Sequence, residues 1–254
     1  MKDFRRDYEN REHIILNKLS EAGAVSVTVL AQELGLSEVT IRGDLKTLED
    51  KGMLSRTRGG AAPSMHRDIL ERQRVYSDQK NAIAHAAAEL VRDGDVIMIE
   101  AGTTTALIAR YLLGKRDVHI VTNSTLVFAY ARMNPNLQIT MTGGEFRRPT
   151  ESMVGPIALE TISRLNVRLA FVGTDGFTLE RGMTTHLMEG AEIVKAMKAH
   201  ATTTILTADS SKYGKTGFAS VLPLSDMNLI ITDGGLSDGA AAELENENIT
   251  LTRV

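Results

Sequence analysis

The chain has 254 residues, of which 43% are hydrophobic, and a formal net charge of −3, so it can form two domains and is not basic overall. The absence of cysteine excludes disulfide bonds and thiolate metal sites, and the six histidines are too scattered to indicate a metal site. The chain has no run of about 18 apolar residues and starts with the charged segment MKDFRRDYENREH, so we expect a cytoplasmic protein without a membrane span, secretory signal or cofactor.

Two helices are predicted near the start of the chain. Residues 10–22 carry apolar side chains at helical spacing, which predicts an amphipathic helix. Residues 27–34 predict a shorter helix that Ser26 is placed to cap and that Gly35 ends.

The stretch Ser37–Leu48 (SEVTIRGDLKTL) predicts a third helix. Its apolar residues Ile41, Leu45 and Leu48 follow the i, i+4, i+7 spacing of a buried stripe, and Ser37 is placed to cap its first turn. The residues that point away from the stripe are Val39, Arg42, Gly43 and Lys46. The short connection to the preceding helix predicts a helix-turn-helix, whose second helix can enter a DNA major groove. The alternative is a surface helical hairpin of an α/β protein.

A basic wing is predicted after this helix. Residues 53–61 (MLSRTRGGA) alternate in polarity and end in a glycine turn, which predicts a β-wing carrying Arg56 and Arg58. Residues 51–74 include six basic and two acidic residues, and such a local patch attracts phosphate whatever the net charge. The alternative is a solvated basic linker. Three helices and a wing predict a winged helix-turn-helix domain at residues 1–60.

The motifs of this region carry a family resemblance. The spacing R-x3-I-x3-L at residues 11–19 is followed by S-x2-T-I-R-x-D-L at residues 37–45 and by RTRGGA in the wing. These motifs resemble the N-terminal signature of the DeoR family of bacterial sugar-metabolism repressors, which implies binding to double-stranded operator DNA. The family usually has Lys or Arg at Gly43, a departure that removes a basic contact and costs the helix about 1 kcal/mol relative to alanine. The expected DNA-binding residues are Ser37, Val39, Thr40, Arg42, Gly43, Lys46, Arg56 and Arg58.

The rest of the chain has a different pattern. Residues 61–77 lack core periodicity and predict a linker. From residue 78 to residue 254, helix-like segments alternate with short apolar runs, which predicts an α/β domain with a mainly parallel sheet covered on both faces. Helices are expected at residues 78–92, 103–113, 124–133, 156–165, 187–200 and 238–247. Strands are expected at residues 96–99, 118–121, 137–141, 169–172, 204–207 and 229–232, with an edge strand at 249–252.

Glycine- and hydroxyl-rich segments follow the predicted strands, where ligands bind in open α/β sheets. These segments are Gly102–Thr105, Thr122–Ser124, Thr142–Gly144, Gly173–Gly176 and Asp209–Lys212. Each segment alone is typical of a helix cap or a turn. We interpret Asp233, which follows the strand predicted at residues 229–232, as part of a turn. Together, their hydroxyls and free N–H groups predict an anionic, oxygen-rich ligand such as a sugar phosphate. Lys212 can pair with phosphate, while Asp175 and Glu189 can accept hydrogen bonds from sugar hydroxyls; alternatively, Lys212 and Glu189 are solvated surface residues.

The same segments extend the resemblance to roughly residues 8–235. EAGTTT, TNS, TGG, GTDG, TTHLMEGAEIVKAM and DSSK resemble successive signature loops of DeoR-family effector domains. The resemblance implies a ribose-phosphate-isomerase-like sensor fold and a phosphorylated sugar as inducer. Glu100 stands where the family usually has Asp, which we expect to reshape the site slightly. The expected effector-binding residues are Gly102, Thr103, Thr104, Thr105, Asn123, Ser124, Gly143, Gly144, Asp175, Glu189 and Lys212.

Two functions fit these residues. Asp175 and Glu189 lie where a related isomerase has its acid and base carboxylates, so an isomerase with an accessory N-terminal domain is the alternative. Those isomerases have a lysine before a glycine run, whereas residues 178–185 (TLERGMTT) have neither, and Arg181 cannot shuttle protons. We therefore predict a non-enzymatic DNA-binding repressor of a carbohydrate operon that a sugar phosphate releases from DNA. A two-fold operator would suit a homodimer, and the resemblance also allows a tetramer.

Overall fold

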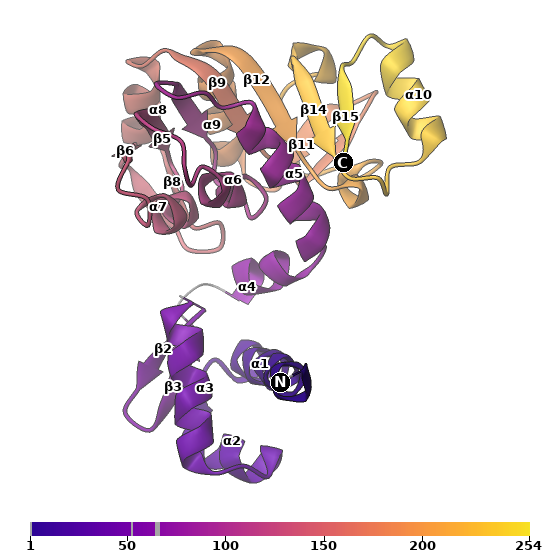
Figure 1. Ribbon diagram of the computed structural model, residues 1–254. Helices are drawn as coiled ribbons and strands as arrows, with labels where there is room; N and C mark the ends of the chain where they lie inside the picture. The colour runs from indigo at the N-terminus through magenta and orange to yellow at the C-terminus, as the bar shows by residue number, and fades with distance from the viewer. Residues whose placement is uncertain (1, 52, 64–66) are drawn as a thin grey trace. The chain divides into compact units, whose positions relative to one another are not determined.

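The computed structural model describes residues 2–51, 53–63 and 67–254, with side chains from Asn10 onward except those of Pro63 and Arg67. The chain forms two compact units, Met1–Arg72 and Gln73–Val254, which are described separately (Figure 1). No helix in the described part is long and apolar enough to cross a membrane.

The segment predicted as a linker, residues 61–77, includes regular structure. It contains the end of β3, all of α4 (Arg67–Arg74) and the first residue of α5 (Ser77–Glu89), while residues 64–66 lie outside the described residues. The only apolar residues of α4 are Ile69 and Leu70, both buried. Two adjacent apolar residues produce no helical periodicity, which is why the sequence did not predict this helix.

The N-terminal unit is a winged helix-turn-helix. Its elements are α1 (Lys2–Ala22), β1 (Val25–Ser26), α2 (Val27–Leu34), α3 (Glu38–Asp50), β2 (Leu54–Thr57) and β3 (Gly60–Pro63). The three strands form an antiparallel sheet in the order β1-β3-β2, so the wing runs beyond residue 60. A Cβ atom at Gly60 would lie 1.9 Å from the Val25 carbonyl oxygen, so the pairing of β1 with β3 requires glycine.

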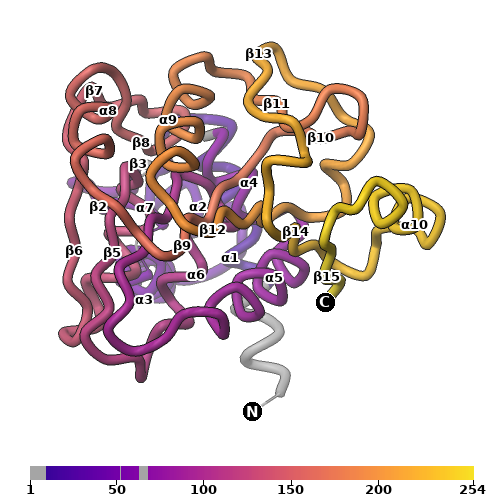
Figure 2. The backbone as a smooth tube through the Cα atoms, turned by 90° about the horizontal axis from the view of Figure 1, so that it is seen from above, coloured from indigo at the N-terminus to yellow at the C-terminus, as the bar shows by residue number. Residues whose placement is uncertain are grey.

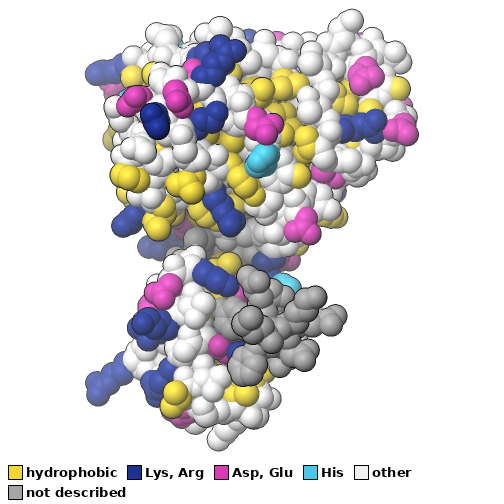
Figure 3. All heavy atoms as spheres, in the orientation of Figure 1, with side chains coloured by type: hydrophobic (Ala, Val, Ile, Leu, Met, Phe, Trp, Pro, Cys, Tyr) yellow, Lys and Arg dark blue, Asp and Glu magenta, His cyan; other side chains and the backbone are white. Residues whose placement is uncertain are grey.

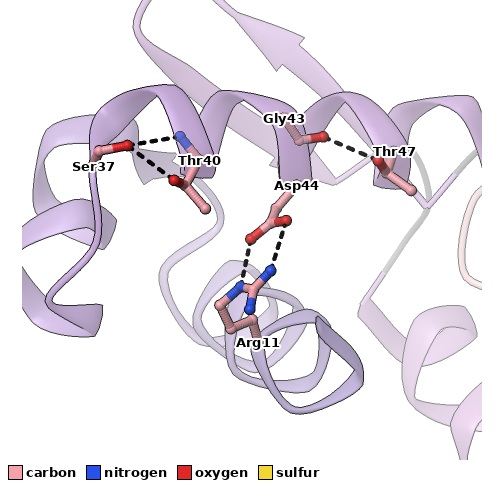
Figure 4. A network of polar contacts seen from close by, with 6 residues as sticks. All are labelled: Arg11, Ser37, Thr40, Gly43, Asp44 and Thr47. Carbon is pink, nitrogen blue, oxygen red and sulfur yellow. Dashed lines mark hydrogen bonds and ion pairs between the residues drawn. The ribbon is translucent and has the colours of Figure 1, made fainter. Parts of the chain in front are cut away.

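The helices pack around a small apolar core, and the predicted apolar stripe of α3 is part of this core. Ile41, Leu45 and Leu48 of α3 are buried, as predicted. The Ser37 hydroxyl accepts a hydrogen bond from the Thr40 N–H at 3.1 Å and caps α3 (Figure 4). Ser26 occupies the N-cap position of α2 but makes no side-chain capping bond. The buried core residues of this unit are Ile15, Leu16, Leu19, Val27, Leu30, Ala31, Ile41, Leu45, Leu48, Leu54 and Ala61.

A charged pair joins α1 to α3 beside this core. The Arg11 guanidinium donates from Nε to Asp44 Oδ2 at 2.7 Å and from Nη2 to Asp44 Oδ1 at 3.2 Å (Figure 4). Asp44 is 7% exposed, so the bonds to Arg11 offset much of the cost of burying its carboxylate. The apolar stripe alone did not predict this polar contact.

The C-terminal unit has a seven-stranded parallel sheet, as expected for an α/β fold. The strands are β4 (Val96–Ile99), β5 (Val118–Thr122), β6 (Leu137–Met141), β9 (Val167–Val172), β12 (Ala201–Thr207), β14 (Leu229–Thr232) and β15 (Leu251–Arg253). Their spatial order is β15-β14-β12-β9-β4-β5-β6. The chain therefore builds outward from β4 to β6 and then returns to place β9 on the other side of β4. The topological switch point lies between β4 and β9.

Helices cover both faces of this sheet (Figures 1 and 2). Besides α5, they are α6 (Thr105–Tyr111), α7 (Thr125–Ala131), α8 (Pro156–Ser163), α9 (Met188–Ala199) and α10 (Asp238–Asn246). Helices α8 and α9 pack on one face through a core that includes Met98, Ile162 and Ile193. Helices α5 and α6 lie on the opposite face (Figure 2).

Several short elements lie at the carboxyl edge of the sheet. They are the hairpin β7 (Glu145–Arg147) and β8 (Ser152–Val154), the sheet of β10 (Gly176–Thr178), β11 (Gly182–Thr185) and β13 (Ala219–Ser220), and the 3-10 helix η1 (Ser210–Lys212). A second 3-10 helix, η2 (Leu224–Asp226), directly precedes β14 at the amino edge. Elements of two to four residues are too short to produce a periodic pattern, so the sequence did not predict them.

We expect Asp44→Ala to destabilise the N-terminal unit. The substitution removes both hydrogen bonds to Arg11, so the free energy of unfolding should fall by about 2–3 kcal/mol. Urea denaturation followed by circular dichroism measures the change. Asp50→Ala, at an exposed acid near the end of the same helix, is the matched control and should change the value by less than about 0.5 kcal/mol. Equal stability of the two variants would contradict this role for the ion pair.

Candidate DNA-binding surface and effector site

The outer face of α3 contains the residues predicted to bind DNA. Arg42, Gly43 and Lys46 are exposed on α3, and so are the cap Ser37 and the first-turn residue Thr40. Val39 is 80% exposed, and its apolar side chain suits contact with a thymine methyl group.

The Arg42 guanidinium is held by an acid of the same helix. Arg42 Nη2 lies 3.0 Å from Glu38 Oε2, and the other oxygen of Glu38 accepts a hydrogen bond from the Thr28 hydroxyl at 2.7 Å. The Thr28 hydroxyl and then the Arg42 guanidinium lower the pKa of Glu38 below its usual value, which favours the charged carboxylate. The sequence analysis did not identify Glu38, although its i, i+4 spacing to Arg42 is the signal of such a pair.

The wing is attached to α3 by a second acid. Glu49 accepts hydrogen bonds from Arg56, from the backbone N–H at 2.9 Å and from Nε at 2.6 Å. These two donors lower the pKa of Glu49. Among the described residues, Arg58 and Lys46 have no hydrogen-bond or ion-pair partner, so their charges are available to DNA. Basic and acidic side chains accordingly lie together on this unit's surface (Figure 3).

The backbone at Gly43 accommodates a side chain. A Cβ atom added there would meet no heavy atom within 4 Å, and the residue is not in the left-handed region. The Gly43 carbonyl accepts a hydrogen bond from the Thr47 hydroxyl at 3.0 Å (Figure 4). The free protein therefore does not require glycine at this position.

The centre of the predicted effector site lies at the topological switch point. Glu100, which is 9% exposed, follows β4, and its Oε2 accepts a hydrogen bond from the Gly173 N–H after β9 at 3.1 Å. Glu100, the acid that departs from the family pattern, thus links the two halves of the sheet.

The loop Gly102–Thr105 presents backbone donors beside Glu100. Thr105 donates its hydroxyl to the Gly102 carbonyl at 3.1 Å, and a Cβ atom at Gly102 would lie 2.8 Å from the Thr105 hydroxyl oxygen. This tight turn therefore favours glycine. Within the described residues, the N–H groups of Gly102, Thr103 and Thr104 have no hydrogen-bond partner.

Asn123 and Ser124 are buried and support this loop. The Asn123 side chain accepts a hydrogen bond from the Ala101 N–H at 3.0 Å and donates to the Met153 carbonyl of β8 at 3.1 Å. The Ser124 hydroxyl accepts a hydrogen bond from the Val127 N–H at 3.2 Å and caps α7. Both side chains therefore have structural partners at the edge where the sequence predicted ligand contacts.

The next predicted loop positions the β7–β8 hairpin. Gly143 and Gly144 have φ values of 69° and 112°, which favour glycine. A Cβ atom at Gly144 would lie 2.5 Å from the Val154 carbonyl oxygen, so the hairpin also depends on the missing side chain.

The predicted polar contacts for a sugar come from different strands. Asp175 Oδ2 accepts hydrogen bonds at 2.9 Å from both the Thr185 hydroxyl and the His186 N–H. Lys212 is half-buried in η1 after β12, two strands from β4, or about 10 Å across the sheet. The structure therefore places Lys212 at the same carboxyl edge as the Gly102–Thr105 loop, after a strand that is not adjacent to β4.

Glu189 has a cationic partner that the sequence analysis missed. Its Oε1 lies 2.9 Å from Arg147 Nη2, which also lies 3.3 Å from Glu145 Oε2. The backbone N–H of Glu189 and then the Arg147 guanidinium lower the pKa of Glu189. The basic pair in GGEFRR, directly after a predicted loop, was the available signal for Arg147.

The comparisons with known proteins agree over both units. Residues 11–65 match the family "DeoR-like helix-turn-helix domain", and residues 76–234 match "DeoR C terminal sensor domain". The chain belongs to the DeoR family. It is therefore a DNA-binding transcriptional regulator, and the predicted family resemblance is confirmed.

Relatives of this DeoR-family regulator match it along nearly their whole length. The HTH-type transcriptional regulator GlpR of Haloferax volcanii is 35% identical over 245 residues, covering 95% of this chain and 96% of that protein. The putative aga operon transcriptional repressor of Escherichia coli O157:H7 is 32% identical, covering 90% of this chain and 87% of that protein.

Solved structures with a similar fold are more distant. A D-ribose-5-phosphate isomerase in complex with phospho-erythronic acid is 18% identical over 54% of each chain, with a TM-score of 0.41. The Pyrococcus horikoshii translation initiation factor eIF-2B is 16% identical over 88% of this chain and 86% of that chain, with a TM-score of 0.42. Both likenesses concern the fold alone.

We expect Gly43→Arg to bind operator DNA more tightly than the wild type. The new side chain has room, adds a positive charge and improves the helix propensity of α3. Fluorescence anisotropy with duplex DNA from upstream of the chain's own gene measures the affinity. Gly43→Ala, which adds helix propensity without charge, is the control. Weaker binding by both variants would show that the DNA backbone approaches Gly43 too closely for a side chain.

We expect Arg42 to contact a base and Arg58 to contact a phosphate. Arg42→Ala should lose about 1–3 kcal/mol of binding free energy, and only on sequences that place guanine opposite it. Arg58→Ala should weaken binding to all sequences and reduce the salt dependence by about one ion. Titrations of operator and unrelated duplexes at several salt concentrations separate the two effects. Unchanged affinity of both variants would remove these residues from the interface.

Proposed function

We propose that this regulator represses a carbohydrate operon and that a phosphorylated sugar releases it from DNA. The observation that carries the proposal is the group of N–H groups at Gly102, Thr103 and Thr104, which have no hydrogen-bond partner among the described residues and lie beside the switch point of the sheet. Its relative from Escherichia coli is named as a repressor of one operon, which supports the repressor role. Because operator DNA is its proposed target, we propose that it works in the cytoplasm.

The phosphate is proposed to bind the Gly102–Thr105 loop. Backbone N–H groups and threonine hydroxyls bind phosphate oxygens without requiring a cationic side chain. Thr104 supports this location because it is only 9% exposed and makes no side-chain hydrogen bond within the described residues. Arg147 and Lys212 are the candidate cations around this edge, and both can strengthen phosphate binding.

The sugar hydroxyls are proposed to bind the carboxylates at the same edge. Glu100, Asp175 and Glu189 are acceptors when ionised, and sugar hydroxyls are donors that suit them. Three carboxylates also disfavour a second phosphate through charge repulsion. A sugar with one phosphate is therefore the ligand class that these residues favour. The backbone loops at Asn123–Ser124 and Gly143–Gly144 complete the proposed surroundings.

We propose binding without turnover. An aldose–ketose isomerisation needs a group that transfers protons and a group that stabilises the enediolate. The β10–β11 hairpin, residues 176–185, has Arg181 near its turn and no lysine. Because arginine stays protonated, it cannot serve as the proton-transfer group.

For the effector to release the protein from DNA, its affinity must differ between two conformational states of the protein. A ligand shifts a conformational equilibrium only if it binds one state better than the other. We propose that the effector favours the state with low DNA affinity. A homodimer or tetramer is proposed because helix-turn-helix regulators commonly read two-fold operators.

We expect a phosphorylated sugar to bind at least about tenfold more tightly than the same sugar without phosphate. Pentose and hexose monophosphates are first screened by thermal stabilisation, and calorimetry then measures each pair. Thr104→Val and Lys212→Ala should weaken binding, whereas Thr202→Val, at the amino end of β12, should not. The bound sugar should release the protein from operator DNA, and NMR should detect no chemical conversion of the sugar. If the sugar without phosphate binds as tightly as the phosphorylated sugar, or if both variants keep wild-type affinity, the proposed site is wrong. Isomerisation of the sugar would favour the alternative that the protein is an isomerase.

A further inference from the structure

Glu38 joins the two helices of the helix-turn-helix through a single carboxylate. One oxygen accepts the Thr28 hydroxyl of α2 at 2.7 Å, and the other binds Arg42 Nη2 of α3 at 3.0 Å. The arginine and the acid are both partly exposed, with 56% and 43% of their side-chain surface accessible. The pair therefore lies on the surface that DNA would meet.

The ion pair itself adds little to stability. Exposed i, i+4 ion pairs contribute little to folding, and salt screens them. The arrangement instead restricts the orientation of Arg42. A free arginine side chain has many rotamers, whereas one Nη group bound to a carboxylate leaves the remaining donors of the guanidinium in a defined direction. A guanine edge needs two such donors in one plane.

The carboxylate also changes which part of DNA attracts Arg42. A free arginine is attracted by any phosphate, and such contacts give affinity without sequence information. Glu38 neutralises much of this attraction, because its negative charge lies 3.0 Å from the guanidinium and repels phosphates itself. A base edge has no net charge and does not suffer this repulsion.

We propose that Glu38 is a specificity-determining residue, which holds Arg42 for a base edge and prevents it from binding phosphates. The proposal rests on DNA binding by this family and on the base contact that we proposed for Arg42. It does not involve the effector, so it stands or fails independently of the sugar-phosphate site. The competing explanation is that Glu38 merely stabilises the first turn of α3 as an acid near a helix N-terminus.

Glu38→Gln tests the proposal because glutamine has nearly the same shape and no charge. The wild-type chain first selects its preferred duplex from a randomised library, and affinities are then measured for that duplex and for a random-sequence duplex. The variant should bind the random duplex several-fold more tightly, and its ratio of specific to non-specific affinity should fall at least about tenfold. Its salt dependence on the random duplex should increase by about one ion, because Arg42 is released to a phosphate.

Two further variants separate orientation from charge and from stability. Thr28→Val removes only the hydroxyl that holds Glu38, so the specificity ratio should fall less than in Glu38→Gln. Asp50→Asn removes one negative charge from the same helix outside the Glu38 contacts, so any gain in affinity should be equal for both duplexes and leave the ratio unchanged.

A selection repeated with the Glu38→Gln protein gives the clearest outcome. Loss of preference at one base position, with an unchanged melting temperature, supports the proposal. An unchanged specificity ratio, with or without a lower melting temperature, would overturn it and leave Glu38 with the helix-stabilising role. An Arg42→Ala protein that keeps the wild-type base preference would also overturn it.

Discussion

The bidentate ion pair between Arg11 and Asp44 sets the position of α3 on α1, and the DNA-binding surface depends on that position. The apolar stripe of α3 can slide or rotate slightly against a small core, whereas two directed hydrogen bonds at 2.7 and 3.2 Å define one orientation. With Asp44 facing inward, the opposite side of the helix, including Arg42 and Lys46, faces solvent. The buried carboxylate and the apolar stripe of α3 together therefore determine which side chains DNA can reach.

Acids recur around the basic residues of this unit. Glu38 binds Arg42, and Glu49 binds Arg56, so two of the four predicted basic contacts are neutralised within the chain. These acids also contribute to the net charge of −3. Non-specific attraction to phosphate is reduced, and the sequence-dependent contacts gain relative weight.

The sensor unit depends on a different constraint, which is the meeting of two half-sheets at β4 and β9. Glu100 after β4 binds the Gly173 N–H after β9, and Asn123 after β5 binds the Ala101 N–H. These bonds connect loops that are up to 73 residues apart in the chain. They hold the N–H groups of Gly102, Thr103 and Thr104, which have no partner within the described part of the chain, at the edge where parallel α/β sheets bind ligands.

The sequence by itself determined the elements whose signal is local. The stripe of α3, the Ser37 cap and the strands of the parallel sheet follow from spacing within a few residues, because helices and strands have fixed periods. Tertiary structure alone decided the partners of polar groups, such as Asp44 with Arg11 and Glu189 with Arg147, and the pairing of β1 with β3. These contacts join residues that no local period relates, since they depend on how distant segments pack. The apolar pattern that drives folding is therefore visible in the sequence, whereas the pairing of polar groups is determined only when distant segments pack together.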